Sequence, residues 1–106
     1  MTGEDQRLLR EAADRLERLA ARTAPGDWRL SGLLASRPEV VAHTPDGGTE
    51  HVAEARARTG AWITALSPDL AGPLAAWLRA SAGTASTGTA SPEAVAVARH
   101  LLRRLP

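Results

Sequence analysis

Apolar residues recur at helical spacing over the first fifth of the chain and predict an amphipathic helix over residues 2–23. Thr2 followed by Asp5 three residues later is typical of a helix start. Pro25 and Gly26 end the pattern. The apolar stripe consists of Leu8, Leu9, Ala12, Leu16, Leu19 and Ala20.

The pattern changes over residues 27–48, where proline, glycine and β-branched residues replace the helical stripe. Trp28–Leu30 and Glu39–His43 have the character of short strands, and Pro45–Gly48 is a strong turn signal. We therefore expect a small β-hairpin or meander of two or three short strands between helices. Two short strands are marginally stable alone, so this hairpin must pack on helices, with Trp28 as its anchor.

Three further helices are predicted after the hairpin. Helical spacing of apolar residues indicates helices over 49–66 and 68–82, the second opening with Ser67, Pro68 and an acidic residue. Residues 83–90 are small and uncharged, which favours a flexible linker. Ser91, Pro92 and Glu93 then begin a C-terminal helix over 91–105, with a stripe from Ala94 to Leu105.

The predicted fold class is α+β and helix-dominated, with four helices and a small β-hairpin between the first and second. The length of 106 residues fits a single domain over 1–106. Positions that share helical spacing in separate segments are expected in its core: Leu16, Leu19, Trp62, Ile63, Leu66, Leu74 and Leu102.

Composition shows that this core is thin. Hydrophobic residues make up 43% of the chain, but 22 of them are alanine. The absence of cysteine excludes disulfides and thiolate metal sites. The apolar runs are too short for a membrane span and no secretory signal opens the sequence, so we expect a cytoplasmic protein without membrane contact.

The formal net charge is +1, and all basic residues are arginine. Because the charges nearly balance, the high pI reflects the high pKa of arginine and is weak support for nucleic-acid binding.

Few residues of the sequence are candidates for a catalytic or metal-binding site. On the predicted helix, His51 and Glu54 lie three residues apart, a spacing that can share a metal, with His43 or Asp46 as further ligands. The favoured alternative is a solvated helix start. Neither a nucleophile elbow nor a phosphate loop is present. We therefore predict no catalytic residue, no metal and no cofactor, and a small hydrolase or metal-dependent enzyme is the least favoured function.

A non-enzymatic binding module is the predicted function. The C-terminal helix combines an apolar stripe with an arginine-bearing face, so a protein partner or self-association, most simply a homodimer, is expected. A nucleic-acid-binding regulator that uses the arginine-rich face is the alternative, although no aromatic residue is interleaved for base stacking. The candidate binding residues are Trp77, Arg99, Leu101, Leu102 and Arg103.

Five short segments carry a resemblance to known proteins, and they occur along the chain in the order Leu8–Ala13, Thr23–Arg29, Glu50–Ala53, Trp62–Pro68 and Leu74–Leu78. Together they resemble small proteins common in actinobacterial genomes and their phages and prophages, and more distantly the Ead-like family of phage accessory proteins. The resemblance implies an accessory protein of phage or mobile-element origin, with no catalytic residue to carry over. Asp27, where such turns often have proline, and the uncharged segment before the last helix depart from the pattern.

Overall fold

A computed structural model describes residues 2–32, 37–85 and 88–106. The fold is α+β and helix-dominated, with a three-stranded antiparallel sheet. Where the sequence predicted one domain, the chain forms two compact units. We call them the helical unit (Met1–Arg22 and Ala71–Pro106) and the sheet unit (Thr23–Leu70).

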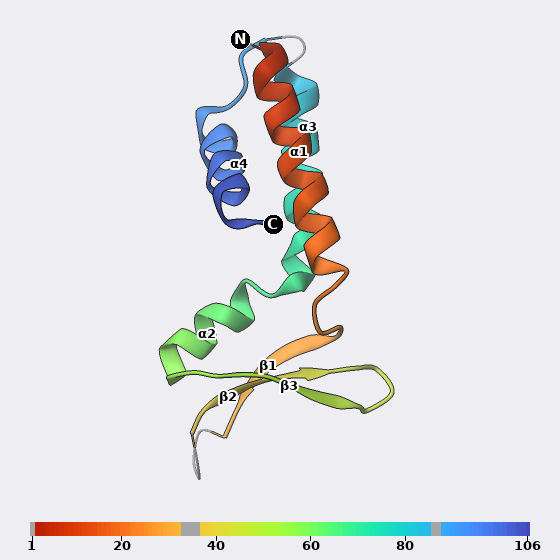
Figure 1. The fold of residues 1–106 in the computed structure, drawn as a ribbon, viewed down its shortest axis with the longest axis vertical. Coiled ribbons are helices and arrows are strands. Elements are labelled where there is room, and N and C mark those ends of the chain that lie inside the picture. The colour runs from red at the N-terminus through yellow and green to blue at the C-terminus, as the bar shows by residue number, and fades with distance from the viewer. Residues whose placement is uncertain (1, 33–36, 86–87) are drawn as a thin grey trace. The chain divides into compact units, whose positions relative to one another are not determined.

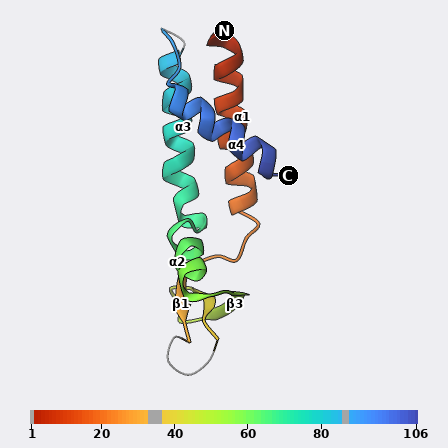
Figure 2. The same ribbon diagram turned by 90° about the vertical axis from the view of Figure 1, so that its left-hand side faces the viewer.

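The helical unit consists of α1 (Thr2–Ala20), α3 (Ala71–Ala85) and α4 (Pro92–Arg104). Helices α1 and α3 lie side by side in opposite directions, and α4 crosses them (Figures 1 and 2). The stripe predicted for the first helix therefore meets two partner helices.

Alanine dominates the core of the helical unit. Leu9 and Leu78 are its largest fully buried side chains, and most other buried positions are alanine. The expectation that Leu16, Leu19, Leu74 and Leu102 form the core was wrong, since all four are only half-buried. Small side chains on facing helices let the backbones approach closely, so the longer leucines lie at the margins of the contact.

The sheet unit holds β1 (Asp27–Ser31), β2 (Glu39–His43), β3 (Thr49–Glu54), α2 (Ala57–Ala65) and the short 3₁₀ helix η1 (Pro68–Leu70). The strand order is β1-β2-β3. Val40 and Ala42 of the central strand are fully buried, and α2 lies over this face of the sheet (Figure 1).

The prediction of a helix over 49–66 was wrong in its first half. Thr49–Glu54 forms β3, which pairs with β2 and turns the expected hairpin into a three-stranded sheet. The cause is the turn after β2, in which the Thr44 N–H donates to the Gly48 carbonyl at 2.9 Å and directs the chain back along β2. The helix itself begins only at Ala57.

The turn that leads into β1 depends on Gly26. Its φ is +103°, and a Cβ on this residue would lie 2.4 Å from the His43 carbonyl oxygen. Trp28 fixes the same turn, because its indole N–H donates to the Ala24 carbonyl at 2.9 Å. Glycine is needed here both for its conformation and for the close approach of two backbone segments.

The segment predicted as a flexible linker over 83–90 is anchored to the helical unit near both of its ends. Residues 83–85 are the last turn of α3, and Ala85 and Ala90 are buried in the helical core. Residues 86 and 87 lie outside the described residues. Alanine side chains are sufficient to anchor this segment because the core is itself built from alanine. The predicted start of the last helix is confirmed: Ser91 caps α4 and accepts from the Ala94 N–H at 3.3 Å.

Candidate functional site

Helix α4 carries four of the five residues predicted to bind a partner. Arg99 and Arg103 are exposed, as that prediction requires. Leu101 and Leu102 are instead half-buried against the core of the helical unit. The apolar stripe of α4 is thus covered within the chain, mainly by α1, and the two leucines do not present a free docking surface.

The fifth residue, Trp77, lies on an exposed face of α3 and retains 42% of its surface in solvent. Its neighbours on this face are exposed and uncharged. We call the face the α3 strip, made of Pro73, Ala76, Trp77, Ala80 and Thr84. An uncharged solvent-facing helix surface is unusual in a chain of which 24% is charged.

A hollow of about 300 Å³ lies beside the α3 strip. Its other residues are small and come from α3 and from the residue that caps α4. The hollow is lined by Trp77, Ala80, Ser81, Thr84 and Ser91. A bulky side chain and a space bordered by small ones therefore occur next to each other on one surface.

Arg79 is the one charged residue of α3, and it lies on the flank that faces α1. Its guanidinium donates to Asp14 Oδ1 at 2.8 Å and is also paired with Glu17. These hydrogen bonds, first the one to Glu17 and then the one to Asp14, raise the pKa of Arg79 above its usual value. The only charge on α3 is thereby neutralised against α1 and away from Trp77.

A second apolar surface lies on the sheet unit. The sequence pattern did not predict this surface. Trp62 and Leu66, both predicted in the core, are 69% and 49% exposed, and Leu70 of η1 is also exposed. Helix α2 contacts the sheet through the side that carries Gly60, where the backbone comes close to Leu30. Trp62 and Leu66 lie on a different side of this short helix, and no sequence signal indicated which side would meet the sheet.

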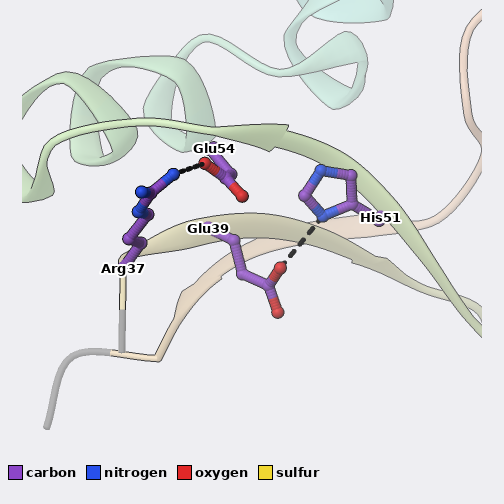
Figure 3. A network of polar contacts seen from close by, with 4 residues as sticks. All are labelled: Arg37, Glu39, His51 and Glu54. Carbon is purple, nitrogen blue, oxygen red and sulfur yellow. Dashed lines mark hydrogen bonds and ion pairs between the residues drawn. The ribbon is translucent and has the colours of Figure 1, made fainter. Parts of the chain in front are cut away.

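The other face of the sheet carries a polar network (Figure 3). His51 Nδ1 lies 3.0 Å from Glu39 Oε2, and Arg37 Nη1 lies 3.3 Å from Glu54 Oε2. The β-strand pairing is irregular between Val40 and Val41, where β3 contains an additional residue. This bulge allows His51 and Glu54, three residues apart on a strand, to lie on the same face.

The metal site considered for His51 and Glu54 does not assemble. Both residues lie on β3 and are paired with Glu39 and Arg37 instead of with each other. Asp46 is held in its turn, since the Thr44 hydroxyl and the Gly48 N–H both donate to its carboxylate, and these bonds lower its pKa. Within the described ranges, no three histidine or carboxylate side chains gather to hold a metal ion.

Arginine side chains gather at the C-terminal ends of α1 and α4. A small hollow of about 130 Å³ is lined by Arg15, Arg18, Leu19, Arg22 and Pro106, so the end of α4 reaches the last turns of α1. The acidic residues nearest in sequence to these arginines form ion pairs. Glu11 pairs with Arg15, and Asp14 and Glu17 both pair with Arg79. This end of the helical unit is therefore basic.

Comparisons with known proteins found no matching family model, curated protein or solved structure. The resemblance to the Ead-like family thus stays a prediction. In the part of the chain that the structure describes, no helix is both long enough and apolar enough to cross a bilayer.

Proposed function

We propose that this protein is a non-enzymatic binding module that engages a protein partner through the α3 strip. The observation that carries the proposal is the exposed, uncharged helix face around Trp77. Covering such a face releases apolar surface from water, and tryptophan is among the residues that contribute most to protein interfaces.

The α3 strip is also rigid. The opposite side of α3 holds Ala75, Leu78 and Ala82, all fully buried in the core of the helical unit. A partner that binds the strip would meet a helix whose conformation is already fixed. Less ordering of the backbone is then required on binding, which favours the α3 strip over the exposed apolar residues of the short helix α2.

Photo-cross-linking in the cell that makes the protein tests this proposal. A benzophenone amino acid replaces Ala80 on the α3 strip, and the matched control carries it at Ala96, which is exposed on α4. We expect a cross-linked protein adduct at position 80, its loss when Trp77→Ala is added, and none at position 96. Equal adducts at both positions, or no adduct at position 80, would contradict the proposal.

A second candidate function, binding of a phosphate-rich polyanion such as nucleic acid, is favoured by the basic end of the helical unit. Arg18 of α1 and Arg22, which follows α1, line a hollow with Pro106, and the last turn of α4 just before Pro106 carries Arg103 and Arg104. The C-terminal residue Pro106 thus lies beside arginines from the first part of the chain. A concentrated basic surface is the electrostatic feature that polyanion binding requires.

Salt dependence tests this second function. If duplex DNA binds at this end, log affinity should fall with log salt concentration by about 0.9 per phosphate contacted. Replacing both Arg18 and Arg103 by glutamine should reduce that slope by about two, whereas Arg58→Gln in the sheet unit should leave it unchanged. Equal slopes for the two variants would remove the support for a DNA site at this end.

A further inference from the structure

We infer that the occupant of the α3 strip is a second copy of this chain, bound through a two-fold axis that pairs α3 with α3 in antiparallel orientation. This inference rests on the proposed function and names the partner. It places the self-association expected from the sequence on α3, because the structure shows the stripe of α4 already covered by α1.

The α3 strip and the hollow beside it are complementary to each other in shape. A two-fold interface uses the same patch on both copies, so that patch must contain both the protruding and the receiving parts. The α3 strip does so: Trp77 is bulky and 42% exposed, and it also forms one wall of the hollow of about 300 Å³, whose other lining residues are Ala80, Ser81, Thr84 and Ser91. The indole of one copy can therefore enter the hollow of the other.

The register of the two α3 helices also favours this pairing. An antiparallel two-fold that places Trp77 opposite Ser81, at the centre of the hollow, has its axis level with position 79. Helix α3 spans Ala71–Ala85, so its midpoint is Leu78. The register that fills the hollow is thus nearly the register in which the two helices overlap along their whole length of about 22 Å. The two-fold rotation leaves Trp77 of one copy and the hollow of the other copy on the same side of the helix pair. The indole and the hollow can therefore meet.

The charge and the size of the residues near the two-fold axis also favour this pairing. The α3 strip carries no charge, so two copies meet without repulsion or loss of charge solvation. Arg79 lies at the level of the axis but is held by Asp14 and Glu17 of its own chain. Ala80, the strip residue nearest the axis, is small enough for close helix approach. A single helix face falls in the weak size class of interfaces, so we expect micromolar association.

Disulfide trapping tests the inference directly, because the chain has no cysteine of its own. Ala80→Cys places a thiol next to the axis, and Ala96→Cys is the matched control on exposed α4. In an oxidising glutathione buffer at micromolar protein, we expect Ala80→Cys to form the covalent dimer at least about tenfold faster than Ala96→Cys. Equal rates for the two variants would overturn the inference.

Two further changes test how the copies contact each other. Trp77→Ala removes the side chain that enters the hollow, and Ser81→Glu places a charge where the partner's indole would lie. Each should slow trapping of Ala80→Cys by about tenfold, the change expected when one central interface residue is lost. A rate that neither change alters, in variants whose melting temperature is retained, would contradict the contact.

The failures of the two proposals are distinguishable. If the purified chain is not trapped at position 80 but the photo-cross-linker at that position captures a different protein in cells, the inference of self-pairing fails and the proposed function stands. If neither reagent at position 80 reacts more than at position 96, both fail.

Discussion

At the scale of single residues, small side chains determine how this protein packs. Among the described residues, the largest fully buried side chains are Leu9, Leu78 and Val40, and most remaining core positions are alanine. Gly60 has the same role in the sheet unit, where an added Cβ would lie 2.4 Å from Leu30 Cδ1. Helix α2 approaches the sheet closely because this position has no side chain.

The Gly60–Leu30 contact gives a prediction about stability. Gly60→Ala should destabilise the sheet unit, since overpacking costs about 1–3 kcal/mol and the helix propensity of alanine offsets about 1 kcal/mol. In the Leu30→Val background the clashing methyl group is absent, and the same substitution should become neutral or stabilising. Denaturant unfolding of the four proteins in this double-mutant cycle measures the difference.

The expected coupling between the two sites is at least about 0.5 kcal/mol. An equal effect of Gly60→Ala in both backgrounds would show that Leu30 does not limit the approach of α2. Gly83→Ala is the matched control, because a Cβ there meets no atom within 4 Å. It should be neutral or mildly stabilising.

At the scale of elements, the sequence predicted segments well where caps and helical spacing agree. The first helix and the last one, with Ser91 as its cap, lie where the patterns placed them. Residues 49–54 were assigned to the wrong class because Val52 and Ala55 have a spacing compatible with a helix. Residues 49–54 form a strand because the turn before them places them along the edge of β2, with which they pair. The spacing of apolar residues within the segment does not encode this contact with another strand.

The candidate site shows the same limit. Trp77 is one of the binding residues predicted from the sequence, and the structure places it on an exposed face. The sequence predicts Leu101 and Leu102 as binding residues because their helix follows a segment predicted to be a flexible linker. That reasoning failed because Ala85 and Ala90 bind the segment to the core. The orientation of α2, and with it the exposure of Trp62, depends on the close contact at Gly60.

At the scale of the whole molecule, the chain divides its apolar surface and its charge between two units. Most of its 13 arginines belong to the helical unit, whereas acids outnumber arginines in the sheet unit. Both proposed binding surfaces, the α3 strip and the basic end, are formed within the helical unit alone. We therefore propose that recognition takes place on the three helices of the helical unit.

Sedimentation of two oppositely charged variants tests the central claim, that the α3 strip pairs two copies of this chain, without knowledge of any other partner. Position 80 lies next to the proposed axis, so each copy meets the same residue of the other. At a concentration where the unmodified chain sediments as a dimer, Ala80→Arg alone and Ala80→Glu alone should each sediment as one chain, and their equimolar mixture should return to the mass of two. The same pair of substitutions at Ala96 should leave the dimer unchanged. Single-chain mass for the unmodified protein at all concentrations, or dimers of Ala80→Arg as stable as those of the unmodified chain, would contradict the account.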